Sequence, residues 1–126
     1  GQYDGFLKII SKYGGTDAAN LAHFYAGSCF IKLNQNEKAV THLKKFSTSS
    51  KPVQARAYKL LADAYADMGK NADALEYYKK AARHFEKDDQ KEAIDLYKEL
   101  KEKFPRSQQA FDADNYLAQL GVYNVD

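Results

Sequence analysis

The chain has 126 residues, which is enough for one domain with a modest hydrophobic core. Its 19 Lys and Arg residues nearly balance its 17 Asp and Glu residues, and a net charge of +2 predicts neither a nucleic-acid-binding surface nor attraction to an anionic membrane. No run approaches the roughly 18 apolar residues of a membrane span, and the single cysteine, Cys29, excludes an internal disulfide.

Apolar residues recur at helical spacing along most of the chain while Val is scarce, so the sequence predicts an all-α fold without strands. Asn34 and Gly69 are expected to end helices, because these residue types best tolerate the left-handed conformation that often follows a helix. Ser107 is expected to cap the last helix. The chain begins inside the first predicted helix, so we expect a fragment of a longer protein. The predicted helices cover residues 2–13, 17–33, 36–48, 53–68, 71–85, 90–103 and 107–120.

The sequence matches itself when it is shifted by 35 residues. Each unit of this repeat consists of two predicted helices joined by a tight turn, and small residues recur where the two helices would approach closely. We therefore expect burial of the small residues Gly27, Ala39, Ala62 and Ala74 and of the large residues Phe30, Leu61 and Tyr65. In the shifted alignment Ala26 and Gly27 fall on Leu61 and Ala62, Phe30 on Tyr65, Asn34 on Gly69, Ala39 on Ala74, and Leu43 on Tyr78.

This pattern resembles the tetratricopeptide repeat over residues 20–86. His23 replaces the aromatic residue that leads the pattern, and Glu86 stands where a proline often occurs. The resemblance implies an antiparallel helix-hairpin solenoid wound as a right-handed superhelix. The positions that carry it are His23, Ala26, Gly27, Phe30, Ala39, Leu43 and Pro52 in the first unit, and Tyr58, Leu61, Ala62, Tyr65, Ala74 and Tyr78 in the second.

The whole chain is predicted to form one such domain, with incomplete units at its ends. Residues 1–16 and 90–105 each look like the second helix of a unit without its first helix. Ala93 and Tyr97 carry the spacing of a second helix, and Pro105 follows them. The predicted divisions are a half repeat at 1–16, repeats at 17–51 and 52–86, a half repeat at 90–105, and a closing helix at 107–121.

The junction between the last full repeat and residues 90–105 is too short for this division. Ala93 follows Ala74 by 19 residues instead of 35, so about 16 residues, the length of a first helix and its turn, are missing. The favoured explanation is an omitted helix, which predicts a break, or a Cα–Cα step far above the about 3.8 Å of a trans peptide, between Glu86 and Gln90. The alternative is that the helix from Gln90 packs antiparallel to the helix that ends near Phe85.

The sequence offers no convincing catalytic or metal-binding cluster. His23 takes a packing position, His42 an exposed one and His84 a helix end, and none has a second ligand at suitable spacing. Cys29 lies in an apolar run, where we expect a buried, inert thiol without a base partner. We therefore expect no enzyme activity, no metal and no cofactor.

The candidate binding residues follow from the resemblance, which implies that the outward face of each first helix lines a concave groove. This face is apolar in the first unit, through Phe24 and Ile31, and charged in the second. We hypothesise a partner peptide or helix with an apolar anchor against Phe24 and an acidic residue near Arg56 and Lys59. The alternative is that Phe24 and Ile31 pack against the preceding half repeat. The full set of predicted partner-binding residues is Phe24, Ser28, Ile31, Arg56, Lys59 and Asp63.

The resemblance implies a protein-interaction scaffold that binds a peptide or helix of a partner protein, with no nucleic acid and no direct membrane insertion by this chain. The alternative is a non-catalytic homo-oligomerisation module, because a second copy could cover the half repeat at residues 1–16. The tail at residues 97–121 is similar to the end of repeat proteins of the bacterial envelope, such as cell-division coordinators and outer-membrane assembly lipoproteins. This similarity suggests a membrane-anchored or periplasmic location, with the cytoplasm as the alternative.

Overall fold

The computed structural model describes residue 5, residues 17–88 and residues 90–119. These residues contain helices and no strand, which confirms the all-α prediction. Within them, no helix is both long enough and apolar enough to cross a membrane. The predicted helix 2–13 and the half repeat 1–16 lie outside the described residues, apart from position 5. The helices are α2 (Asp17–Lys32), α3 (Asn36–Lys45), α4 (Lys51–Asp67), α5 (Asn71–Asp88), α6 (Gln90–Lys103) and α7 (Gln108–Gln119).

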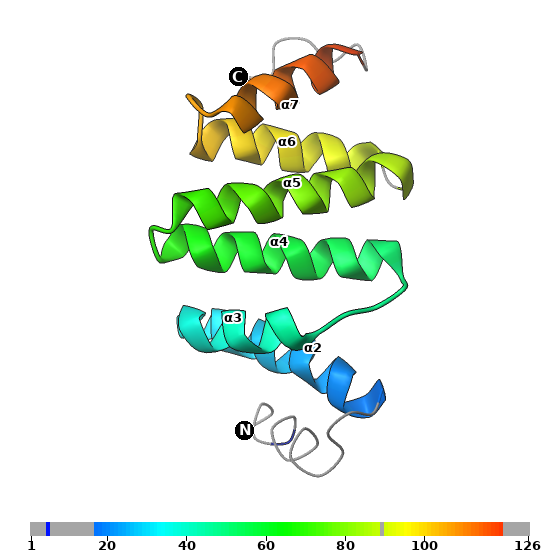
Figure 1. Ribbon diagram of the computed structural model, residues 1–126, viewed down its shortest axis with the longest axis vertical. Coiled ribbons are helices and arrows are strands. Elements are labelled where there is room, and N and C mark those ends of the chain that lie inside the picture. Colours follow the sequence, from blue (N-terminus) through cyan, green and yellow to red (C-terminus); the bar gives the residue numbers. More distant parts are fainter. Residues whose placement is uncertain (1–4, 6–16, 89, 120–126) are drawn as a thin grey trace.

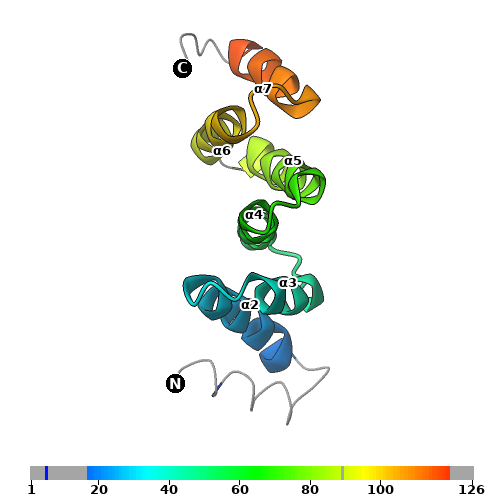
Figure 2. The same cartoon turned by 90° about the vertical axis from the view of Figure 1, so that its left-hand side faces the viewer.

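The helices form a single stack in which each helix packs against the next one along the chain. Consecutive helices alternate in direction (Figure 1). Turning the molecule shows α4 and α6 on one side of the stack and α3, α5 and α7 on the other (Figure 2). Because α2 also contacts α4, we call the side of α2, α4 and α6 the first-helix face and the side of α3, α5 and α7 the second-helix face.

The core confirms the seven burial predictions made from the repeat. Ala39, Ala62 and Ala74 have no exposed surface, and Gly27 is buried against α3. A Cβ atom at Gly27 would lie 2.5 Å from Cγ of Leu43, so glycine is what allows α2 and α3 to approach this closely. The large residues buried around these positions include Phe30, Leu61 and Tyr65, as expected.

The two turns within the repeats have the predicted left-handed residues. Asn34 has φ 58° and Gly69 has φ 75°. In both turns an amide reaches back across the helix end, from Gln35 to the Phe30 carbonyl at 2.8 Å and from Lys70 to the Tyr65 carbonyl at 2.9 Å. These bonds satisfy carbonyl groups that the helix end would otherwise leave open.

Three helix boundaries can be explained by their terminal residues. Helix α3 ends at Lys45 instead of the predicted residue 48, because Phe46 becomes extended and buries its ring. Helix α4 begins before Pro52, a position where the missing proline N–H costs nothing. Helix α7 begins after Ser107, whose Oγ accepts a hydrogen bond from the Ala110 amide at 3.0 Å, so the predicted cap is confirmed.

Helix α5 extends to Asp88 and α6 starts at Gln90. Figure 1 shows α6 running back alongside α5, which is the antiparallel arrangement given as the alternative. The predicted chain break stays a prediction, because residue 89 lies outside the described residues. In this arrangement α6 takes the place of a first helix and α7 that of its second helix, whereas the repeat pattern predicted α6 as a lone second helix. Leu96 and Leu100, which are buried, follow Leu61 and Tyr65 by the same 35 residues.

Candidate partner-binding surface

The six predicted binding residues come from two helices that contact each other on the first-helix face. Phe24, Ser28 and Ile31 belong to α2, and Arg56, Lys59 and Asp63 belong to α4. Arg56 is exposed, and the other five are partly buried. The structure therefore brings the two helices into contact but leaves the two groups of side chains in different environments.

Phe24 is held by its own repeat. Its ring centroid lies 5.0 Å from that of Phe46, the residue that ends α3, and 5.7 Å from that of Tyr25. Ser28 donates its hydroxyl hydrogen bond to the Phe24 carbonyl, at 3.1 Å. Ile31 packs partly buried against the core. The alternative prediction, that Phe24 and Ile31 pack against the preceding half repeat, stays a prediction, because residues 1–16 lie outside the described residues apart from position 5.

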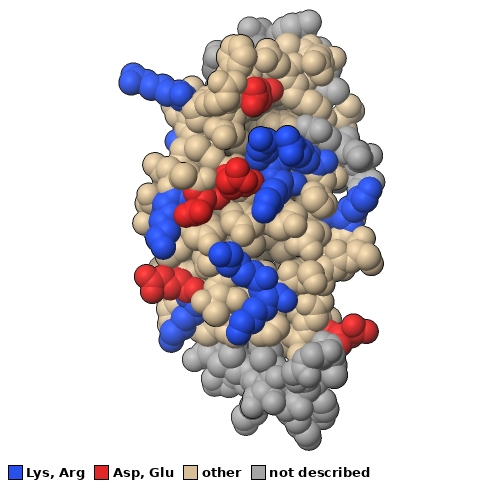
Figure 3. All heavy atoms as spheres, in the orientation of Figure 1, with Lys and Arg blue, Asp and Glu red and all other residues tan. Residues whose placement is uncertain are grey.

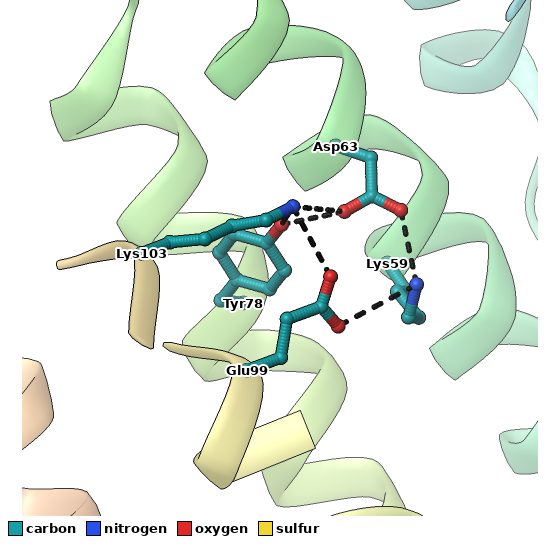
Figure 4. A network of polar contacts seen from close by, with 5 residues as sticks. All are labelled: Lys59, Asp63, Tyr78, Glu99 and Lys103. Atoms are coloured by element: carbon teal, nitrogen blue, oxygen red, sulfur yellow. Dashed lines mark hydrogen bonds and ion pairs between the residues drawn. The ribbon is translucent and has the colours of Figure 1, made fainter. Parts of the chain in front are cut away.

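Lys59 and Asp63 belong to a network of charged and polar side chains that joins α4, α5 and α6 (Figure 4). Lys59 lies 3.0 Å from one carboxylate oxygen of Asp63 and 3.7 Å from Glu99. Lys103 lies 3.1 Å from Glu99 and 3.4 Å from the other oxygen of Asp63. Tyr78 donates its hydroxyl to Asp63 at 2.5 Å and accepts a hydrogen bond from Lys103 at 2.9 Å.

The network balances its own charge, because two lysines face two carboxylates around the Tyr78 hydroxyl. Burial and the hydrogen bond to Asp63 raise the pKa of Tyr78 far above its usual value. Burial lowers the pKa of Lys103, but hydrogen bonds to Tyr78 and Glu99 outweigh this effect and the pKa ends above its usual value. Tyr78 and Lys103 thus keep their protons near neutral pH. The arrangement is better suited to holding the three helices together than to proton transfer.

This network changes the part that Lys59 and Asp63 can play in binding. The sequence treated both as charges available to a partner, whereas Lys59 already lies between two carboxylates. Arg56, one turn earlier, has no ion pair among the described residues and is exposed. Of the predicted cations, Arg56 is therefore the one that can receive an acidic partner residue.

A contact between two histidines was not foreseen from the sequence. Nδ1 of His23 lies 3.0 Å from Nδ1 of His42, which joins α2 to α3. The His42 ring also stacks on Phe30, with centroids 5.4 Å apart, so His42 is half-buried instead of exposed as predicted. Burial and the nearby Lys45 lower the pKa of His23, and burial, His23 and Lys45 lower the pKa of His42.

Cys29, expected to be buried, is half-buried. In the part of the chain that the structure describes, no group of three or more His, Cys, Asp or Glu side chains could hold a metal ion. The candidate surface on α2 and α4 therefore combines the apolar side chains of Phe24 and Ile31, the exposed guanidinium of Arg56 and a neutralised charge network.

Residues 18–100 match the family model described as bacterial transcriptional activator domain. This segment covers well over half of the chain and runs from α2 into α6. The chain belongs to the bacterial transcriptional activator domain family. The matched segment includes both repeats except residue 17, together with the histidine contact and every member of the charge network except Lys103. No curated protein matches the chain. Family membership and the helix stack together establish an all-helical, repeat-like domain.

Proposed function

We propose that the chain is the non-catalytic protein-interaction domain of a bacterial transcription activator, and that its first-helix face holds a segment of another protein. The observation that carries this proposal is the family match over residues 18–100. The tetratricopeptide-like pattern over residues 20–86 supports it, because stacked helix pairs of this kind present extended binding surfaces. The envelope location expected from residues 97–121 stays a prediction.

The chemistry of the first-helix face supports a particular kind of partner. Phe24 offers a partly exposed aromatic ring on α2, and Arg56 offers an exposed guanidinium on α4 that has no ion pair among the described residues. Aromatic residues and arginine are enriched at protein interfaces, because an aromatic ring offers a large apolar contact area and a guanidinium offers directed hydrogen bonds. The proposed partner segment therefore has an apolar side chain against Phe24 and a carboxylate against Arg56.

The experiment that tests this proposal is affinity capture from cells of the source organism with matched variants. The immobilised wild-type chain is compared with Phe24→Ala and Arg56→Glu, and captured proteins are identified by mass spectrometry. We expect one protein to be captured by the wild type and lost with both variants. Lys70→Glu, an exposed charge change at the turn after α4, should retain it. Equal capture by all four forms would contradict the proposal, and thermal unfolding of each variant shows whether it is folded.

Sedimentation equilibrium distinguishes self-association, the alternative function, from binding of another protein. The proposal predicts a monomer near 14.3 kDa. A dimer that Phe24→Ala converts to monomer would favour the homo-oligomerisation module, because the same apolar side chain would then be covered by a second copy.

A further inference from the structure

A second surface lies on the second-helix face, where α5, α6 and α7 meet. An open cleft of about 280 Å³ occupies this junction. It shares no residue with the predicted binding set on α2 and α4. The side chains that line it include Lys79 and Arg83 from α5, Tyr97 and Leu100 from α6, and Asp112 and Tyr116 from α7.

The floor of the cleft is apolar and aromatic. Tyr97 and Leu100 are almost fully buried, and the ring centroids of Tyr97 and Tyr116 lie 4.7 Å apart. Burying an apolar side chain on such a floor removes its surface from water, which is the main driving force of association. The floor therefore suits one apolar or aromatic side chain of a ligand.

The α5 side of the cleft is cationic. Lys79 and Arg83 are one helical turn apart, so their side chains lie on the same face of α5. Neither has an ion pair among the described residues. Figure 3 shows Lys and Arg side chains gathered over this part of the second-helix face. Two such cations beside an apolar floor attract a ligand that carries carboxylates.

The α7 side of the cleft has the opposite charge. Asp112 lies on this wall and accepts a hydrogen bond from Gln108 at 3.1 Å. A phosphate backbone that followed the cleft would meet this carboxylate, and a net charge of +2 gives the chain little overall attraction for a polyanion. A short ligand with its acidic groups toward α5 avoids Asp112, which favours a protein segment over a nucleic acid.

We infer that the cleft between α5, α6 and α7 binds an acidic segment of a partner protein, with one apolar or aromatic side chain on the floor and a neighbouring Asp or Glu against Lys79 and Arg83. Tyrosine and arginine are the residue types that contribute most at protein interfaces, and both are present here. This surface gives the domain a second attachment point, on the opposite side from Arg56.

The test uses a fluorescein-labelled peptide of repeated Asp-Phe-Glu-Leu units and measures its fluorescence anisotropy with the purified chain. A matched peptide carries Asn and Gln in place of Asp and Glu. We expect the acidic peptide to bind, and the double variant Lys79→Glu, Arg83→Glu to weaken binding at least about tenfold, or about 1.4 kcal/mol. Asp112→Asn should tighten binding a few-fold, because it removes the repelling carboxylate.

A control double variant, Lys32→Glu and Lys51→Glu, makes the same change in net charge at exposed positions outside the cleft. It should change affinity less than about twofold, and Arg56→Glu should leave it unchanged. The inference is overturned if the acidic peptide does not bind, if the amide peptide binds equally well, or if the control variant weakens binding as much. It is also overturned if a DNA duplex binds more tightly than the peptide and loses affinity with Lys79→Glu, Arg83→Glu. Circular dichroism melting of each variant confirms that it is folded.

Discussion

The hydrogen bond between His23 and His42 makes the first helix pair sensitive to pH. An Nδ1–Nδ1 bond needs one ring to donate and the other to accept, so it is lost when both rings are protonated. Burial first, and then nearby positive charge, lowers the pKa of each histidine below that of the unfolded chain. The unfolded state therefore binds protons more readily, and stability falls as the pH drops below about 6.5, the usual histidine pKa.

The prediction is a loss of unfolding free energy between pH 7 and pH 5 that depends on this pair. Urea unfolding at several pH values measures it. His42→Gln should flatten the slope, because the coupled titration is removed. A wild-type slope unchanged in His42→Gln would show that other groups control the acid response.

The hydroxyl of Tyr78 is predicted to stabilise the charge network that joins α4, α5 and α6. Tyr78→Phe keeps the buried ring but removes the donor to Asp63 and the acceptor for Lys103. We expect a loss of about 1–3 kcal/mol in unfolding free energy, as for hydrogen bonds to charged groups. Tyr58→Phe is the matched control, since Tyr58 makes ring contacts and no hydrogen bond through its hydroxyl in the described residues. Equal losses of unfolding free energy in the two variants would contradict a stabilising role for the charge network.

Single residues were predictable from the sequence where their role is local. Gly27 and Ala39 were predicted because a close helix contact needs small residues at a repeated spacing. The His23–His42 bond and the contact of Lys103 with Asp63 were not, because each joins side chains from different helices. Helical spacing gives the face on which a side chain lies but not the partner that it meets across the stack.

At the scale of the helices, Gly69 should be the more demanding of the two turn residues. It has φ 75°, and no atom beyond Gly69 and its two chain neighbours lies within 4 Å of the position that an added Cβ would occupy, so only backbone strain opposes substitution. Gly69→Ala should cost roughly 1 kcal/mol. Gly69→Asn should cost less, since Asn34 adopts the same conformation in the other repeat. Thermal unfolding measures both, and an Ala variant as stable as the Asn variant would argue against a strained turn.

The junction of α5 and α6 shows where helix patterns become ambiguous. Ala93 and Tyr97 have the same spacing as Ala74 and Tyr78 in a second helix. Leu96 and Leu100 equally fit the first-helix positions held by Leu61 and Tyr65. Whether α6 is read as a first or a second helix, its apolar residues lie on one face, so the pattern predicted a helix correctly. Which of the two helices of a repeat it forms depends on the length of the connection before it.

Across the whole molecule, basic side chains that are paired inside the charge network can be distinguished from basic side chains that have no ion pair among the described residues. Lys59 and Lys103 pair with carboxylates within the charge network. Arg56 on the first-helix face and Arg83 on the second-helix face have no ion pair among the described residues. The sequence predicted a binding face on the first helices because the repeat resemblance implies one. It did not predict the cleft at α7, because residues 90–105 were assigned to a different place in the repeat.

Site-specific photocrosslinking in cells of the source organism can show directly whether the first-helix face binds another protein. A photoreactive residue replaces Leu21, an exposed side chain on the α2 part of the first-helix face, or Leu33, an exposed leucine just beyond α2. We expect the residue at position 21 to crosslink to one other protein and the residue at position 33 not to do so. Two outcomes would contradict a first-helix face that binds another protein. One is crosslinking from position 21 only to a second copy of the chain or to nucleic acid. The other is equal crosslinking from both positions.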